Sequence, residues 1–245
     1  ASYNTAVGWG SLKVNTTGTR NTALGNNSLD ANTTASDNTA VGSAALGLNT
    51  TGANNVAIGS LALDANTTAS DNVAIGTLSL SSNTTGNLNV AVGVQSLKAN
   101  TVGDRSVAIG YQALSAQNPS SNADVYNTAV GYQAGKLVTT GIQNTAIGGL
   151  AGDSITSGGG NTIMGYAAGD ALTTGNSNVA VGLSALSGDT LGDRAVAIGQ
   201  GALNAQNFTS STDNYNVGVG YNAGAAVTTG VNNTLIGGLA GDAIT

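Results

Sequence analysis

The side chains that could carry acid–base or metal chemistry are carboxylates, and all twelve acidic residues of the chain are aspartates. Cysteine and histidine are absent, which excludes disulfides and imidazole catalysis and disfavours most transition-metal sites. Asp153 and Asp170 lie one repeat apart and could share a Ca²⁺ ion, but we prefer a solvated charged face. No nucleophile–base pair can be assembled from scattered aspartates, so we predict a chain without catalytic residues, metal or cofactor.

Two insertions are the strongest candidates for binding, because they interrupt an otherwise regular pattern. They lie near residues 117–126 and 206–215, in similar contexts 89 residues apart. They hold the only proline, the only phenylalanine and two of the seven tyrosines. Insertions on one face of a repeat protein often bind partners. The predicted ligand contacts are Asn118, Pro119, Tyr126, Asn207, Phe208 and Tyr215. The alternative is a pair of tolerated loops left by duplication of a five-repeat block.

A short repeat must position these residues. The motif Asn-Thr/Val-Ala-Val/Ile-Gly occurs fourteen times, and its copies begin at 4, 21, 38, 55, 72, 89, 106, 127, 144, 161, 178, 195, 216 and 233. Eleven of the thirteen spacings are therefore equal to 17 and two are equal to 21. A fixed short period predicts a solenoid, in which each repeat is one coil stacked on the previous one. We therefore predict a single continuous parallel β-solenoid, or β-roll, over residues 1–245, with four extra residues at each insertion. Neither end resembles a polar cap, so we expect a piece of a longer chain.

Within one coil, the first motif residue is numbered position 0. Positions 1 and 3 should point to one side of a short strand and position 2 to the other. Position 4 is glycine in every copy, which predicts a positive φ or close approach to a neighbour. A bend, a second short strand and a turn should follow, with threonine at position 12 in twelve coils, Thr16 to Thr245.

Two patterns concern packing. Position 8 is leucine in nine coils and glycine in five, and each of these glycines is followed at position 11 by an aliphatic residue. This exchange predicts an interior of fixed volume that one apolar side chain fills per coil. Positions 2 and 7 are mostly alanine or serine, which we interpret as columns that let another chain approach closely. The alternative is that small residues simply fit inside a narrow coil.

Composition excludes several partners. Charged residues make up 7% of the chain and the net charge is −6, so no basic stripe exists to neutralise phosphates. We therefore expect no nucleic acid and no anionic membrane surface as a partner. No apolar run approaches the ~20 residues of a membrane helix, so this segment should not insert into a membrane.

The Val-Ala-Ile-Gly segments at 56–59, 73–76, 107–110 and 196–199 resemble the Ser-Val-Ala-Ile-Gly head repeats of YadA-like trimeric autotransporter adhesins. Similar repeats occur in phage tail fibres. The resemblance implies a left-handed β-roll, three chains packed side by side, and an extracellular module on a bacterial surface or a virion tail fibre. The coils here are longer than is usual in that family, and no neck, stalk or anchor is present in the sequence.

The function predicted from these features is non-enzymatic adhesion. The chain would act as a homotrimer that attaches to a host-cell, matrix or receptor surface, with glycans among the candidate ligands. One alternative is an ice- or surface-binding solenoid that uses the threonine column. Another is an architectural spacer that leaves binding to a different part of the fibre.

Overall fold

The structure is a computed structural model that describes residues 1–244, and Thr245, the last member of the threonine column, lies outside them. The chain divides into two compact units, Ala1–Tyr126 and Asn127–Thr245. The described residues form strands and turns, and none of them belongs to a helix that could cross a membrane.

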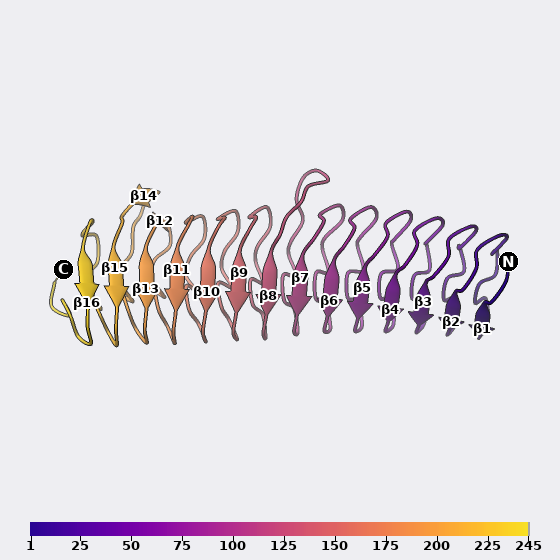
Figure 1. The fold of residues 1–245 in the computed structure, drawn as a ribbon, viewed down its shortest axis with the longest axis horizontal. Coiled ribbons are helices and arrows are strands. Elements are labelled where there is room, and N and C mark those ends of the chain that lie inside the picture. Colours follow the sequence, from indigo (N-terminus) through magenta and orange to yellow (C-terminus); the bar gives the residue numbers. More distant parts are fainter. Residues whose placement is uncertain (245) are drawn as a thin grey trace. The chain divides into compact units, whose positions relative to one another are not determined.

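The first unit carries one three-residue strand per coil, at positions 1 to 3. Each strand pairs in parallel with the strand of the next coil, and the register joins equivalent positions, such as Val56 with Val73. Figure 1 shows these arrows side by side along the unit. The strands are β1 Thr5–Val7, β2 Thr22–Leu24, β3 Thr39–Val41, β4 Val56–Ile58, β5 Val73–Ile75, β6 Val90–Val92 and β7 Val107–Ile109.

The second unit repeats this arrangement and adds one short strand pair, β12 with β14, at the second insertion. Its strands are β8 Thr128–Val130, β9 Thr145–Ile147, β10 Thr162–Met164, β11 Val179–Val181, β12 Gly192–Asp193, β13 Val196–Ile198, β14 Thr212–Asp213, β15 Val217–Val219 and β16 Thr234–Ile236. The two units together contain about fourteen turns. Hydrogen-bonded equivalents in successive regular coils, such as Asn55 and Asn72, are separated by 17 residues. The predicted all-β parallel solenoid with coils of this length is confirmed.

The glycine at position 4 is required for both of the predicted reasons. Gly59 has a φ of +138°, a conformation that L-residues rarely adopt. A Cβ atom there would lie 2.6 Å from the carbonyl carbon of Gly76 in the next coil. The strands can therefore end together, coil after coil, only if this column remains glycine.

The predicted second strand is wrong for most coils. Among the described residues, short strand pairing outside the main strands occurs only at the insertions, in β12–β14 and in the Asp104–Asp124 bridge. Elsewhere positions 6 and 8 are left-handed, as in Leu61 and Leu63 with φ of 57° and 53°. Left-handed residues turn the backbone back on itself, so this side of the coil consists of turns rather than a strand.

The interior is narrow and filled by small side chains. Position 2 (Ala57), position 7 (Ala62) and position 8 (Leu63) are fully buried within the chain itself. The interpretation of positions 2 and 7 as contact columns for another chain is therefore wrong. The alternative holds, because so short a coil leaves no room for larger side chains at these two places.

The exchange between positions 8 and 11 is confirmed. Ile155 at position 11 is buried, and a Cβ atom on Gly152 at position 8 would lie only 2.8 Å from the Cδ1 of Ile155. Gly152 also has a left-handed φ of 55°, as the leucines at this position do. Glycine at position 8 thus makes room for the aliphatic side chain at position 11. It also adopts the left-handed φ without the strain that a leucine has there.

Two columns of buried asparagines hold the coils together, although the repeat pattern gave no reason to expect them in the interior. Asn55 at position 0 donates from Nδ2 to the Ala69 carbonyl of its own coil at 2.9 Å. Its Oδ1 accepts the backbone N–H of Asn72, in the next coil, at 3.0 Å. Asn66 at position 11 donates to the same Ala69 carbonyl at 3.0 Å and to Oδ1 of Asn49 at 2.8 Å. These amides close each coil and link it to its neighbours, which satisfies polar groups that water cannot reach.

Candidate functional site

The first insertion contributes to the interior as well as to the surface. Its coil has Ser106 at position 0 instead of asparagine, and the buried Gln117 donates from Nε2 to the Ser106 hydroxyl at 2.9 Å. Pro119 is buried, and a Cβ atom on Gly103 would lie 2.9 Å from its Cγ. The extra residues therefore close a wider circuit in which proline fills space that a regular coil does not have.

The second insertion replaces a missing ladder group. Ala195 occupies position 0 and has no side-chain acceptor, so the N–H of Asn216 in the next coil bonds instead to Oδ1 of Asn214 at 2.9 Å. Gln206 donates to the buried carboxylate of Asp189 at 2.6 Å. Phe208 is only 5% exposed. The two departures from asparagine at position 0 thus occur where an insertion supplies other polar groups.

Four of the six predicted contact residues lie on the surface. Asn118, Tyr126, Asn207 and Tyr215 are exposed. The prediction that Pro119 and Phe208 present their side chains to a ligand does not match their burial, because both rings fill the interior.

The two exposed asparagines are partly engaged. Oδ1 of Asn118 accepts the Thr101 hydroxyl at 2.7 Å, and Oδ1 of Asn207 accepts the Thr190 hydroxyl at 3.0 Å. These bonds tie each insertion to the preceding coil.

The structure brings together a cluster that the repeat pattern did not predict. At the first insertion Arg105 forms an ion pair with Asp124, and the Tyr126 hydroxyl donates to the same carboxylate at 3.0 Å. The Arg105 guanidinium lies 6.0 Å from the centre of the Tyr126 ring. The hydrogen bond from Asp124, followed by its charge, raises the pKa of Arg105 above its ordinary value.

The same cluster recurs at the second insertion. Arg194 pairs with Asp213 and bonds to the Tyr215 hydroxyl at 3.2 Å, with its guanidinium 5.7 Å from the ring centre. The charge of Asp213 is the main cause that raises the pKa of Arg194. A signal in the sequence could have revealed this cluster. Each lengthened coil is preceded by an arginine and contains an aspartate two residues before its tyrosine, and all three residues recur 89 positions later.

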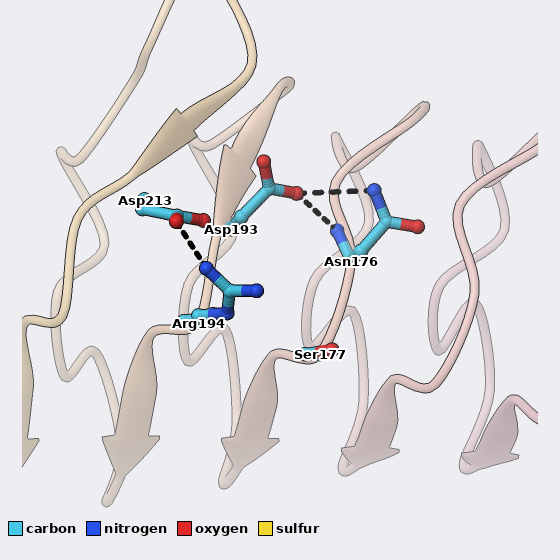
Figure 2. A pocket seen from close by; sticks show the side chains of 5 residues that line it. All are labelled: Asn176, Ser177, Asp193, Arg194 and Asp213. Atoms are coloured by element: carbon cyan, nitrogen blue, oxygen red, sulfur yellow. Dashed lines mark hydrogen bonds and ion pairs between the residues drawn. The ribbon is translucent and has the colours of Figure 1, made fainter.

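A polar hollow of about 280 Å³ lies beside the second cluster (Figure 2). The residues that line it are Asn176, Ser177, Asp193, Arg194 and Asp213. Asp193 is 7% exposed, and its Oδ1 accepts the backbone N–H and the Nδ2 of Asn176 at 2.6 and 3.1 Å. Its Oδ2 accepts the Ser211 hydroxyl at 2.6 Å. These bonds fix the carboxylate at the edge of the hollow.

The aspartates of position 9 show a mild charge conflict. Burial, followed by the charge of Asp170, raises the pKa of Asp153, and burial also raises that of Asp170. Oδ1 of Asp170 is buried without a hydrogen-bond partner. Among residues 1–244, no group of three or more histidine, cysteine or acidic side chains is placed to hold a metal ion.

The threonine column at position 12 links neighbouring coils. The Thr33 hydroxyl donates to the Thr50 carbonyl at 3.2 Å, and the Thr50 hydroxyl donates to the Thr67 carbonyl at 2.9 Å. Because these hydroxyl hydrogens are directed at backbone carbonyls, the column serves first to hold coils in register.

The outward side of the main strands carries a column of apolar side chains at position 3. Position 3 side chains are partly or fully exposed on both units: Leu24 (47%) and Ile58 (38%) in the first and Met164 and Ile198 in the second are exposed, whereas Val41 between the first two is half-buried. Position 5 adds exposed aromatic residues such as Tyr166. Each unit therefore carries a stripe of aliphatic and aromatic side chains along its sheet.

Comparison of the chain with protein-family models, curated proteins and solved structures found no match.

Proposed function

We propose that this chain is a non-enzymatic fibrous attachment module that works as a homotrimer in a bacterial surface adhesin or a phage tail fibre. Its setting would be extracellular, and its partner a host-cell, matrix or receptor surface. Support comes from a fold that repeats one coil in both units and from the Val-Ala-Ile-Gly segments, which resemble adhesin head repeats.

The observation that carries the proposal is the apolar stripe of the strands. Parallel in-register pairing places position 3 of one coil beside position 3 of the next, so Leu24, Val41 and Ile58 follow one another in one column. A column of apolar side chains that stay partly or fully exposed over successive coils usually marks an interaction site. Identical chains that carry the same stripe can bury it symmetrically. We therefore propose position 3 as the trimer contact, in place of positions 2 and 7, which are buried within the chain.

Sedimentation equilibrium of the full chain tests the trimer. The expected mass is three times that of one chain. Ile58→Lys places a charge on the stripe without touching the coil interior and should shift the protein towards monomers. Thr51→Lys is the matched control, because Thr51 is exposed in a turn of the preceding coil and lies outside the strand. A monomeric parent protein, or two variants that assemble equally well, would refute the proposed contact.

Adhesion requires a separate test at the exposed insertion residues. The double variant Tyr126→Ala/Tyr215→Ala keeps the buried Pro119 and Phe208, so the insertions should stay folded. We expect it to bind host cells or matrix less well than the parent protein in a plate adhesion assay. Unchanged adhesion of a trimeric variant would favour an architectural spacer with binding located elsewhere.

A further inference from the structure

The polar hollow at the second insertion has binding capacity that the fold does not use. Arg194 forms its hydrogen bonds through Nη1 alone, to Asp213 and to Tyr215. Its Nε–H and Nη2–H groups have no partner among the described residues, although a guanidinium carries five N–H donors. Figure 2 shows the second Nη of Arg194 directed away from Asp213, on the side of Ser177. The Ser177 side chain is exposed and forms no hydrogen bond within residues 1–244.

The carboxylates that line the hollow supply acceptors. Asp193 is held by Asn176 and Ser211 through three hydrogen bonds, while a carboxylate offers about four acceptor sites. Asp213 also faces the hollow with one oxygen engaged by Arg194 and Tyr215. The site therefore presents fixed donors and fixed acceptors that face the same small volume. Pairs of this kind suit a ligand whose groups both donate and accept, and hydroxyl groups do both.

The charges of the lining select against ionic ligands. Two carboxylates and one guanidinium give the lining a net charge of about −1, which disfavours anions. A cation would meet the guanidinium of Arg194 beside the carboxylates. An uncharged ligand avoids both conflicts.

An aromatic surface adjoins these polar groups. The Tyr215 side chain is 51% exposed, and its hydroxyl bonds to both Arg194 and Asp213, so its ring is held next to the lining of the hollow. An exposed aromatic ring with a fixed orientation offers a flat apolar face to the C–H groups of a ligand. We propose that the hollow and Tyr215 together form a binding site for one neutral sugar unit of a glycan. This inference rests on the proposed attachment function and names the chemistry of the attached surface.

The first insertion provides an internal comparison. Arg105, Asp124 and Tyr126 repeat the cluster, but Leu88 occupies the place that corresponds to Ser177. Leu88 is 46% exposed and its side chain cannot donate or accept a hydrogen bond. The two insertions therefore share the ion pair and differ in the hydroxyl-bearing side chain that lines the hollow, so we assign the sugar to the second insertion.

Saturation-transfer NMR on the full chain tests this site with the methyl glycosides of glucose, galactose, mannose and N-acetylglucosamine. At least one should receive saturation from the protein. Arg194→Gln and Ser177→Leu, the second of which copies the first insertion, should each weaken its binding about tenfold through loss of a charged donor or of the space and hydroxyl. Arg105→Gln should leave binding unchanged, and circular dichroism should show all three variants folded.

Three results would overturn the inference. They are no transfer to any of the four glycosides, transfer only to the methyl glycoside of sialic acid when this charged sugar is added to the panel, and binding that survives both substitutions at the second insertion. Sedimentation of the same samples separates this result from the proposed function. A trimer that adheres without binding sugar removes the sugar site alone, whereas a monomer that binds sugar removes the trimeric fibre and keeps the site.

Discussion

Replacement of Asn55 by alanine should be among the most damaging single changes in the first unit. The substitution removes the Nδ2 bond to the Ala69 carbonyl, which a second asparagine, Asn66, continues to satisfy. It also removes Oδ1, the acceptor for the backbone N–H of Asn72. The first loss costs about 1 kcal/mol, and an unsatisfied buried N–H costs about 2 kcal/mol, so we expect a loss of about 3 kcal/mol in the free energy of unfolding.

Urea unfolding followed by circular dichroism measures this loss, and hydrogen exchange of the Asn72 amide locates it. Asn26→Ala is the matched control, because Asn26 is exposed and its side chain forms no hydrogen bond in the described structure. The control should change stability by less than about 0.5 kcal/mol. Equal stability of the two variants, or an Asn72 amide that remains as protected as before, would show that the buried ladder does not hold the coils together.

Three further predictions concern coil 144–160 of the second unit. Gly148→Ala should lower the free energy of unfolding by about 3 kcal/mol, because the new Cβ would lie 2.5 Å from the Gly165 carbonyl oxygen. The control is Gly149→Ala, whose Cβ would lie at ordinary contact distances and which should leave the stability measured by urea unfolding nearly unchanged. Gly152→Leu and Ile155→Asn should each destabilise alone, but their combination should be more stable than either one, since it restores a single plug; additive losses would contradict this. Asp153→Asn should stabilise at pH 7 by about 0.5 kcal/mol, because the raised pKa of Asp153 means that the folded state disfavours its charge. The stabilising contribution of the native Asp153 side chain is fully present below the ordinary aspartate pKa and disappears as the pH rises through the raised pKa of the folded state. The parent protein and the Asp153→Asn variant should therefore unfold alike near pH 3. A stability gain of the variant that persists at pH 3 would contradict the raised pKa as its cause.

The constant spacing of the motif was enough to predict the stacked coils, since a repeat this short can bury its apolar positions only against its neighbours. The sequence also predicted that a leucine at position 8, such as Leu63, is replaced by an aliphatic residue at position 11, such as Ile155, because the interior volume of a coil is conserved. The burial of Asn55 could not be predicted from the sequence, since asparagine is usually exposed. Only the closed backbone of the folded coil shows that its side-chain amide meets two backbone groups. The second strand failed for a related reason, as leucine at position 8 gives no local signal of a left-handed φ.

The sequence predicted only part of the candidate site, and the reasons for this are physical as well. The lengthened coils identified the right region, and Tyr126 and Tyr215 are indeed exposed. Proline and phenylalanine were placed outside because they are unusual for the repeat, yet a wider circuit needs larger side chains in its interior. Arg194 and Asp213 lie 19 residues apart, and only the return of the chain after the insertion brings the two charges together.

The position-to-position pairing of coils has a consequence for how such a chain can change length. Asn54 and Asp71 occupy the same place in successive coils, and so do Asn55 and Asn72. Excision of residues 55–71 would join Asn54 to Asn72 and give the remaining asparagine ladder the same groups above and below the junction. Recombination between repeats can therefore shorten or extend the stack by whole coils while the buried asparagine ladder stays continuous.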